Sequence, residues 1–190
     1  MEFRILQTKM KKLKKGERGF TLVEILVVLA LIGIITGGIT AAIMQVLTIN
    51  TRASNHMIAV RQVQQAGKEV SKDTLQAQNV VTDGSPDVLL SLTWSEWATG
   101  NTTGNNHTVT YSLEAMPSSE LKKLQRSHSI NSTEPTVIRV AQYIDPNPAQ
   151  TSCSWNNVTR VLTFTVTATV GNGRYGAIET RVYEIEPRPD

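Results

Sequence analysis

One glutamate, Glu24, directly precedes a long segment that has no charged residue. From Ile25 to Thr51 the chain has 27 residues and no ionisable side chain. A carboxylate at the edge of hydrocarbon costs up to about 3 kcal/mol, so it is expected only where a cationic partner can meet it. Gly19, five residues upstream, has no side chain and leaves the backbone free to adopt an extended conformation. The chemistry to look for is therefore a charge pair made by Glu24 and an accessible peptide bond at Gly19.

The other residues with reactive side chains are scattered. His56, His107 and His128 are far apart in the sequence and none has a zinc-ligand spacing, so we expect them to be solvated. Cys153 is the single cysteine, which excludes an intrachain disulfide, and we expect it to be a small core residue. No nucleophile elbow, phosphate-binding loop or dinucleotide fingerprint is present. The chain is therefore predicted not to be an enzyme.

Oxygen ligands of the kind that calcium needs are present but sparse. They are Asp83, Asp87, Asp145 and Asn147. No dense acidic loop of the EF-hand kind surrounds any of them. We predict no metal and no other cofactor, with calcium at these residues as the alternative.

The basic residues are concentrated at the N-terminus. Residues 1–19 carry seven Lys or Arg and two Glu, a local charge of +5, whereas the whole chain has a formal net charge of +3. Nucleic-acid-binding domains carry their basic residues in the folded part, so no direct nucleic-acid binding is predicted. The uncharged segment is long enough to cross about 30 Å of hydrocarbon. The cations before it predict an N-terminus in the cytoplasm and export of everything after residue 51.

We predict a membrane helix over about residues 25–49. Its most apolar part consists of Ile25, Leu26, Val27, Val28, Leu29, Leu31, Ile32, Ile34 and Ile35. Two other interpretations stay open: a buried core helix of a soluble protein, and a secretory signal peptide cut after Ala42 that releases a soluble product. The length of the apolar run argues against both.

An amphipathic helix is predicted to continue beyond the membrane segment. Apolar or small residues recur at steps of three or four, namely Ala53, Met57, Val60, Val63, Gly67, Val70 and Thr74. This period is typical of a helix with one covered face, and it extends to about Gln78. The turn residues Asp83 to Pro86 then end the pattern. Something must cover the stripe that these residues form.

After Pro86 the apolar period switches to two, which is typical of half-buried strands. The alternating segments are 88–94, 109–115 and 162–170, with less regular candidates at Val137–Ile144 and Ala177–Ile185 and a loop at 171–176. One apolar sheet face can lie on the helix stripe. We therefore predict an α+β fold in which a long N-terminal helix, 20–80, packs on an antiparallel β-rich head, 86–190.

The stretch Gly19-Phe20-Thr21-Leu22-Val23-Glu24 ahead of an apolar helix resembles the processing site of type IV prepilins and of the pseudopilins of type II secretion. The resemblance implies that a prepilin peptidase cuts between Gly19 and Phe20, removes the basic leader 1–19 and methylates the new amino group of Phe20. The helix behind the cut is kept. A looser likeness of the head to certain minor pilins and minor pseudopilins rests on its strand order.

Cleavage would create the partner that Glu24 lacks. The new α-amino group is cationic below a pKa of about 8, and in a bundle of identical helices it can lie beside Glu24 of a neighbouring subunit. This pairing would set the axial stagger between subunits. The alternative is that Glu24 only snorkels to the membrane interface. Three glycines, Gly33, Gly37 and Gly38, mark either a bend or a close approach of helices.

The resemblance implies a structural subunit, a minor pilin or pseudopilin, of a pilus, a type II secretion pseudopilus or a DNA-uptake filament. Its implied partners are prepilin peptidase, other pilin or pseudopilin subunits, an inner-membrane assembly platform and the lipid bilayer. The implied location is the inner membrane, with the head outside, and later the filament. Two alternatives are a single-span anchored adhesin that does not polymerise and the soluble product cut after Ala42.

Overall fold

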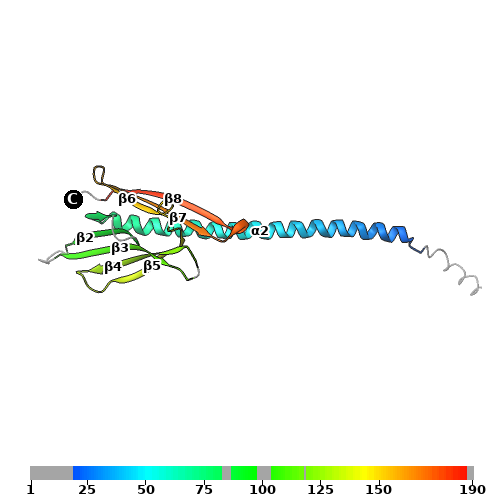
Figure 1. Cartoon of the computed structure of the whole chain (residues 1–190), viewed down its shortest axis with the longest axis horizontal. Coiled ribbons are helices and arrows are strands. Elements are labelled where there is room, and N and C mark those ends of the chain that lie inside the picture. The colour runs from blue at the N-terminus through cyan, green and yellow to red at the C-terminus, as the bar shows by residue number, and fades with distance from the viewer. Residues whose placement is uncertain (1–18, 83–86, 98–103, 118, 188–190) are drawn as a thin grey trace, which may run out of the picture. The chain divides into compact units, whose positions relative to one another are not determined.

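The computed structural model describes residues 19–82, 87–97, 104–117 and 119–187. Figure 1 shows their elements in chain order. They are α2 (Leu22–Thr74), β1 (Asn79–Val81), β2 (Val88–Glu96), β3 (Asn105–Ala115), β4 (Lys122–Ile130), β5 (Thr136–Ile144), β6 (Ser152–Asn156), β7 (Val161–Val170), the short 3-10 helix η2 (Gly173–Tyr175) and β8 (Ala177–Ile185). The chain divides into two compact units, one ending at Leu47 and the other beginning at Thr48, so that α2 contributes to both.

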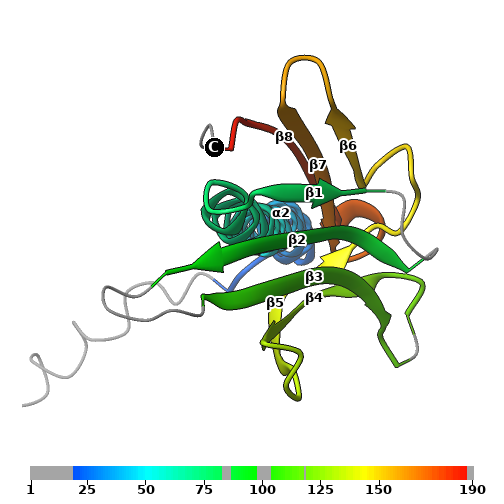
Figure 2. The same ribbon diagram turned by 90° about the vertical axis from the view of Figure 1, so that its left-hand side faces the viewer.

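All the strands belong to one antiparallel sheet in the second unit. The order is β1-β2-β3-β4-β5-β7-β6, and β8 also pairs with β7. One edge of β7 pairs with β6 along Val161–Thr165 and then meets β5 through the single pair Ile144 and Ala168, while its other edge pairs with β8. This sharing of β7 lets the sheet curl. Figure 2 shows the strands wrapped around the part of α2 that lies in this unit.

The core lies between this curled sheet and one stripe of α2. The helix residues buried in it are Ala59, Val63, Ala66, Gly67, Val70, Asp73 and Thr74. The largest fully buried side chains of the sheet are Tyr111, Phe164, Leu90, Leu92, Leu124, Ile144, Leu162, Val109 and Val166. Their positions alternate along each strand, as a sheet with one covered face requires. The predicted α+β fold, with a long helix on an antiparallel sheet, is confirmed.

Gly67 is a point of close approach between helix and sheet. A Cβ built at Gly67 would lie 2.0 Å from Cζ of Tyr183 on β8. The Tyr183 hydroxyl donates a hydrogen bond to the backbone carbonyl of Val63, 3.1 Å away. Only a residue without a side chain leaves room for the ring, so glycine is required here by packing.

The structure corrects the helix in three details. The helix ends at Thr74 rather than near Gln78, because the last amides turn back to form i to i+3 bonds and the Gln78 amide donates to Thr93 of β2 instead. Ala53 and Met57, both predicted to lie in the covered stripe, are exposed. Asp73, a charged residue that is not one of the apolar or small residues of the predicted stripe, is buried.

The strand predictions hold at every segment that was named, and Val137–Ile144 and Ala177–Ile185 are both strands. β1, β4 and β6 were not among the predicted segments: β1 and β6 are too short to show a period of two, and β4 has only two apolar residues, Leu124 and Ile130. The predicted turn at Asp83 to Pro86 lies outside the described residues.

Candidate functional site

Gly19 and Phe20 lie ahead of the first helical residue and are exposed. Thr21 caps the helix, since its hydroxyl oxygen accepts a hydrogen bond from the Glu24 amide at 3.2 Å and its carbonyl accepts one from Ile25 at 3.2 Å. Thr21 and Glu24 thus occupy the two positions of a capping box. The cap holds the helix start, and no described residue approaches within 4 Å of where a Cβ of Gly19 would lie. Among the described residues, the bond between Gly19 and Phe20 therefore lies ahead of the helix and is not part of it.

Glu24 is exposed, and its carboxylate makes no hydrogen bond or ion pair with any residue that the structure describes. A negative charge in the first turn is favoured by the helix dipole, but this effect contributes only about 0.3–1 kcal/mol. In the uncut chain the nitrogen of Phe20 is an amide and carries no charge. The chain by itself thus supplies no cation to pair with Glu24 in the described residues.

The apolar residues that follow are exposed on every side of the helix. The nine predicted membrane residues, Ile25, Leu26, Val27, Val28, Leu29, Leu31, Ile32, Ile34 and Ile35, are all exposed. Within the described part of the chain this is the one helix long and apolar enough to cross a membrane, and its most apolar window has no buried residue. Gly33, Gly37 and Gly38 have no atom within 4 Å of a built Cβ. A helix that is apolar all round needs lipid or other helices around it.

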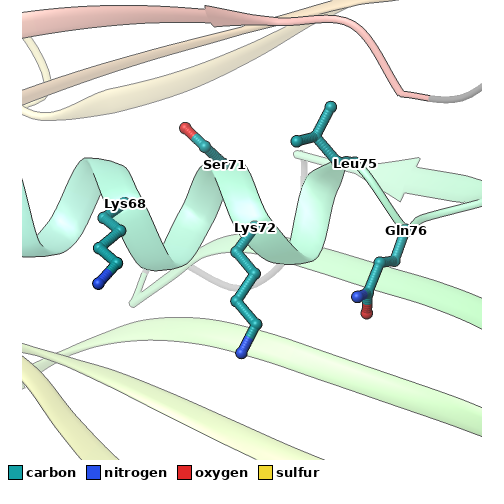
Figure 3. Close-up of a pocket in the computed structure, with 5 residues that line it drawn as sticks. All are labelled: Lys68, Ser71, Lys72, Leu75 and Gln76. Atoms are coloured by element: carbon teal, nitrogen blue, oxygen red, sulfur yellow. The ribbon is translucent and has the colours of Figure 1, made fainter.

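The second unit presents a different helix surface. Lys68, Ser71, Lys72, Leu75 and Gln76 line an open hollow of about 490 Å³ on α2. In Figure 3 the amino groups of Lys68 and Lys72 point in the same direction, one turn apart, away from Ser71 and Leu75. Neither lysine forms an ion pair with a described residue. This face of the helix carries two lysines beside apolar surface, and the sheet leaves it open.

A buried ion pair ties the end of α2 to the sheet. Nε of Arg126 lies 2.6 Å from Oδ2 of Asp73, and Nη2 lies 3.0 Å from Oδ1, so the pair is bidentate. The hydroxyl of Tyr111 donates a further hydrogen bond to the same carboxylate. The hydrogen bond to Asp73 raises the pKa of Arg126, and burial together with Asp73 raises that of Tyr111. The sequence analysis missed this cluster, although Tyr111 and Arg126 face each other across neighbouring strands.

Two histidines form a stack with a tryptophan. Nδ1 of His107 lies 3.0 Å from Nε2 of His128, and Trp94 stacks on His107 with ring centroids 5.1 Å apart. Burial first, and then the nearby Arg126 and His107, lower the pKa of His128. Oε2 of Glu96 lies 3.3 Å from Nε2 of His107, outside hydrogen-bonding geometry. The prediction of solvated histidines is therefore wrong for His107, which is buried, because β2, β3 and β4 bring distant residues side by side.

The residues considered for calcium make separate local contacts. Asp87 pairs with Nζ of Lys122 at 2.7 Å, and Oδ1 of Asp145 accepts a hydrogen bond from the amide of Asn147 at 3.0 Å. Asp83 lies outside the described residues. Among those residues no group of three His, Cys, Asp or Glu is placed to hold a metal. Cys153 packs against the core, and burial raises the pKa of its thiol to about 12.

Comparison with known families gives one match, and it covers the processing site. The family model described as the prokaryotic N-terminal methylation motif matches residues 14–40. No curated protein and no solved structure matches the chain. The match includes Gly19, Phe20 and Glu24 and extends into the apolar helix. It confirms the resemblance that these residues carry, and it does not extend to the head.

Proposed function

We propose that this chain, which carries the N-terminal signature of type IV pilins and pseudopilins, is a minor structural subunit of a type IV filament. The observation that supports the proposal is the part of α2 that lies in the first unit, up to Leu47. Its apolar residues are exposed on all sides, and Glu24 at its start has no cationic partner in the described chain. Both features are explained if identical helices pack together after cleavage.

The mechanism is one of storage and packing. The basic leader keeps the N-terminus in the cytoplasm, and the apolar helix holds the subunit in the inner membrane until assembly. Prepilin peptidase removes the leader after Gly19 and methylates the amino group of Phe20. An assembly platform then transfers the helix into the filament, where neighbouring apolar helices replace the acyl chains.

Glu24 then selects the axial position. The amino group of Phe20 on a neighbouring subunit supplies the missing cation, in an environment where an unpaired charge is costly. Only one stagger between helices brings the two groups together. In this scheme the apolar surface supplies the attraction, and the charge pair chooses among the positions that the apolar surface would accept.

The mass of the mature N-terminus tests the proposal. When the full chain is produced together with prepilin peptidase, we expect a product that starts at methylated Phe20. Gly19→Ala is expected to leave the leader in place, and Gly37→Ala serves as the matched control with normal processing. A product that starts at Met1 would instead indicate the anchored adhesin, and one that starts at Ile43 would indicate the soluble protein. Either result would overturn the filament function.

A second experiment tests the role of Glu24. We expect Glu24→Ala to be cleaved at Gly19 but to be lost from sheared filaments, with at least about a tenfold decrease relative to the membrane pool, which corresponds to about 1.4 kcal/mol. Glu184→Ala removes an exposed carboxylate of the head and is expected to be incorporated normally. Equal incorporation of Glu24→Ala and the unchanged chain would show that Glu24 only lies at the interface.

A further inference from the structure

A cleft opens in the second unit where α2 enters the head. It lies between the helical stretch 49–56 and the start of β8, and its volume is about 740 Å³. Its walls combine four apolar residues with two basic ones, namely Ile49, Ala53, Ala177, Ile178, Arg52 and His56. The cleft is thus lined both by apolar surface and by groups that bind anions.

The connection between β7 and β8 is fixed against the helix, so the cleft is preformed. Nδ2 of Asn55 donates a hydrogen bond to the backbone carbonyl of Tyr175 at 2.8 Å. Gly171, at the start of this connection, has φ of +77°, and a Cβ there would lie 2.4 Å from Nδ2 of Asn55. Glycine satisfies both the backbone conformation and the close contact. Binding of a molecule in the cleft would therefore not require the connection between β7 and β8 to become ordered.

The position of the cleft along the chain places it at the membrane surface. Ile49 is the last residue of the predicted membrane segment, and Arg52 is the first charged residue after the 27 uncharged ones. Side chains at these two positions therefore lie at the boundary between acyl chains and headgroups. This step rests on the proposed function, since it requires that the apolar helix is held in the membrane.

The titratable residues that line the cleft are basic, and none of its lining residues is acidic. Between Glu24 and Glu69 the chain has no acidic residue, and the stretch 171–178 has none either. Arg52 and His56 are four residues apart and so lie on one helix face. Arg52 forms no ion pair with a described residue. Beside these groups Ile178 is 66% exposed and Ile49 is 59% exposed, so apolar surface is left uncovered next to an unneutralised cation.

We propose that the cleft holds one anionic phospholipid of the outer leaflet of the inner membrane. The guanidinium of Arg52 binds the phosphate, His56 donates a hydrogen bond to the headgroup, and the first methylenes of an acyl chain pack on Ile49 and Ile178. An arginine is well suited to this role because its planar donors match phosphate oxygens. A water-soluble anion would leave the two isoleucines exposed, whereas a lipid covers them.

Native mass spectrometry of the full chain in mild detergent tests this proposal. The chain is extracted from nanodiscs that contain phosphatidylglycerol or phosphatidylcholine. We expect one retained phosphatidylglycerol and about a tenfold lower fraction of phosphatidylcholine adducts. Arg52→Gln is expected to lower the phosphatidylglycerol adduct about tenfold. The matched control is Arg61→Gln, an exposed arginine further along α2, which is expected to retain the lipid.

A second variant separates the lipid from its headgroup. Ile178→Ser is expected to weaken retention of phosphatidylglycerol several-fold, and free glycerol phosphate is expected not to bind the unchanged chain. Equal retention by Arg52→Gln and the unchanged chain would overturn the proposal. An equal loss in Arg61→Gln would do so too, since it would indicate unspecific attraction. A dimer without lipid, lost in Arg52→Gln, would identify a second copy as the occupant.

The same spectra keep this inference separate from the proposed function. They report the mass of the N-terminus and therefore show whether the bond after Gly19 has been cut. When the chain is produced together with prepilin peptidase, an uncut chain that retains the lipid would contradict the filament function alone, and a cut chain that retains none would contradict the lipid site alone.

Discussion

The two units share one helix, but its two parts have opposite surroundings. Up to Leu47 the helix is apolar on all sides and has no buried residue in the described structure. From Ala59 to Thr74 one stripe is covered by the sheet, and a bidentate ion pair anchors its end. The glycines show the same contrast, because Gly37 has open space around it whereas Gly67 faces the ring of Tyr183.

The contrast shows what each part of the helix is adapted to contact. The second part finds its partners within its own chain, so changes there are expected to alter the stability of the head. The first part has no cover within the described chain, so under the proposed function changes there are expected to alter assembly. The two parts of the helix can be distinguished by measuring which substitutions change the stability of the head.

The largest effect is expected for the buried ion pair. Asp73→Ala removes the carboxylate that Arg126 and Tyr111 share, and it leaves a guanidinium whose side chain is only 15% exposed. Loss of one partner of a buried pair is destabilising by about 3–5 kcal/mol, and we expect the lower end because Arg126 keeps some contact with solvent. Urea unfolding of the full chain in detergent, followed by tryptophan fluorescence, measures this loss.

The control for this variant is Glu184→Ala, which removes an exposed carboxylate of β8 and is expected to change the free energy of unfolding by less than about 0.5 kcal/mol. Asp73→Ala combined with Arg126→Met is expected to recover part of the loss, since no buried charge is then left unpaired. A single variant as stable as the unchanged chain would show that the head does not depend on this pair.

The next effect is a comparison of two glycines. Gly67→Ala places a methyl group against the ring of Tyr183, and moving the ring breaks its hydrogen bond to Val63. Overpacking of this kind costs about 1–3 kcal/mol. Gly37→Ala adds a methyl group in open space and favours the helix by up to about 1 kcal/mol, with no change in the head. Unfolding in urea should separate the two variants, and equal stabilities would contradict the assigned close approach.

The smallest effect is a dependence on pH. The pKa of His128 is lowered in the folded chain by burial and by Arg126 and His107, whereas Asp73 acts in the opposite direction. The unfolded chain therefore takes up this proton first, so the stability is complete above the ordinary pKa of about 6.5 and falls as the pH decreases through and below it.

Melting temperatures measured between about pH 7.5 and pH 5 are expected to fall more steeply for the unchanged chain than for His128→Asn. The neutral asparagine removes the titrating group and keeps a polar side chain beside His107. Parallel curves for the two proteins would show that other groups, such as the carboxylates, account for the acid sensitivity.

Much of the fold could be predicted because it depends on periodicity. A run of 27 uncharged residues, a helical stripe and strands with alternating residues are each visible within a short window of the sequence. The details that were predicted wrongly depend on contacts between residues that are far apart in the sequence. Met57 matches the helical period but lies where no strand covers it. Asp73 is buried because Arg126, 53 residues later in the chain, pairs with its carboxylate.

The candidate site divides in the same way. Gly19, Phe20 and Glu24 could be recognised because the methylation motif that contains them consists of consecutive residues. The stack of Trp94, His107 and His128 could not, since nothing in the spacing of these residues indicates that three strands bring them together. The open face at Lys68 and Lys72 has no local signature either, and it was found only in the structure.

The hydrogen bond from Tyr183 to Val63 joins residues that are 120 positions apart. During synthesis α2 is therefore complete long before β8 is made. The space beside Gly67 stays uncovered until β8, which carries Tyr183, has been synthesised. Contacts of such long sequence separation form late and slowly. A chain that ended before Tyr183 would thus leave the helix surface at Gly67 and Val63 uncovered.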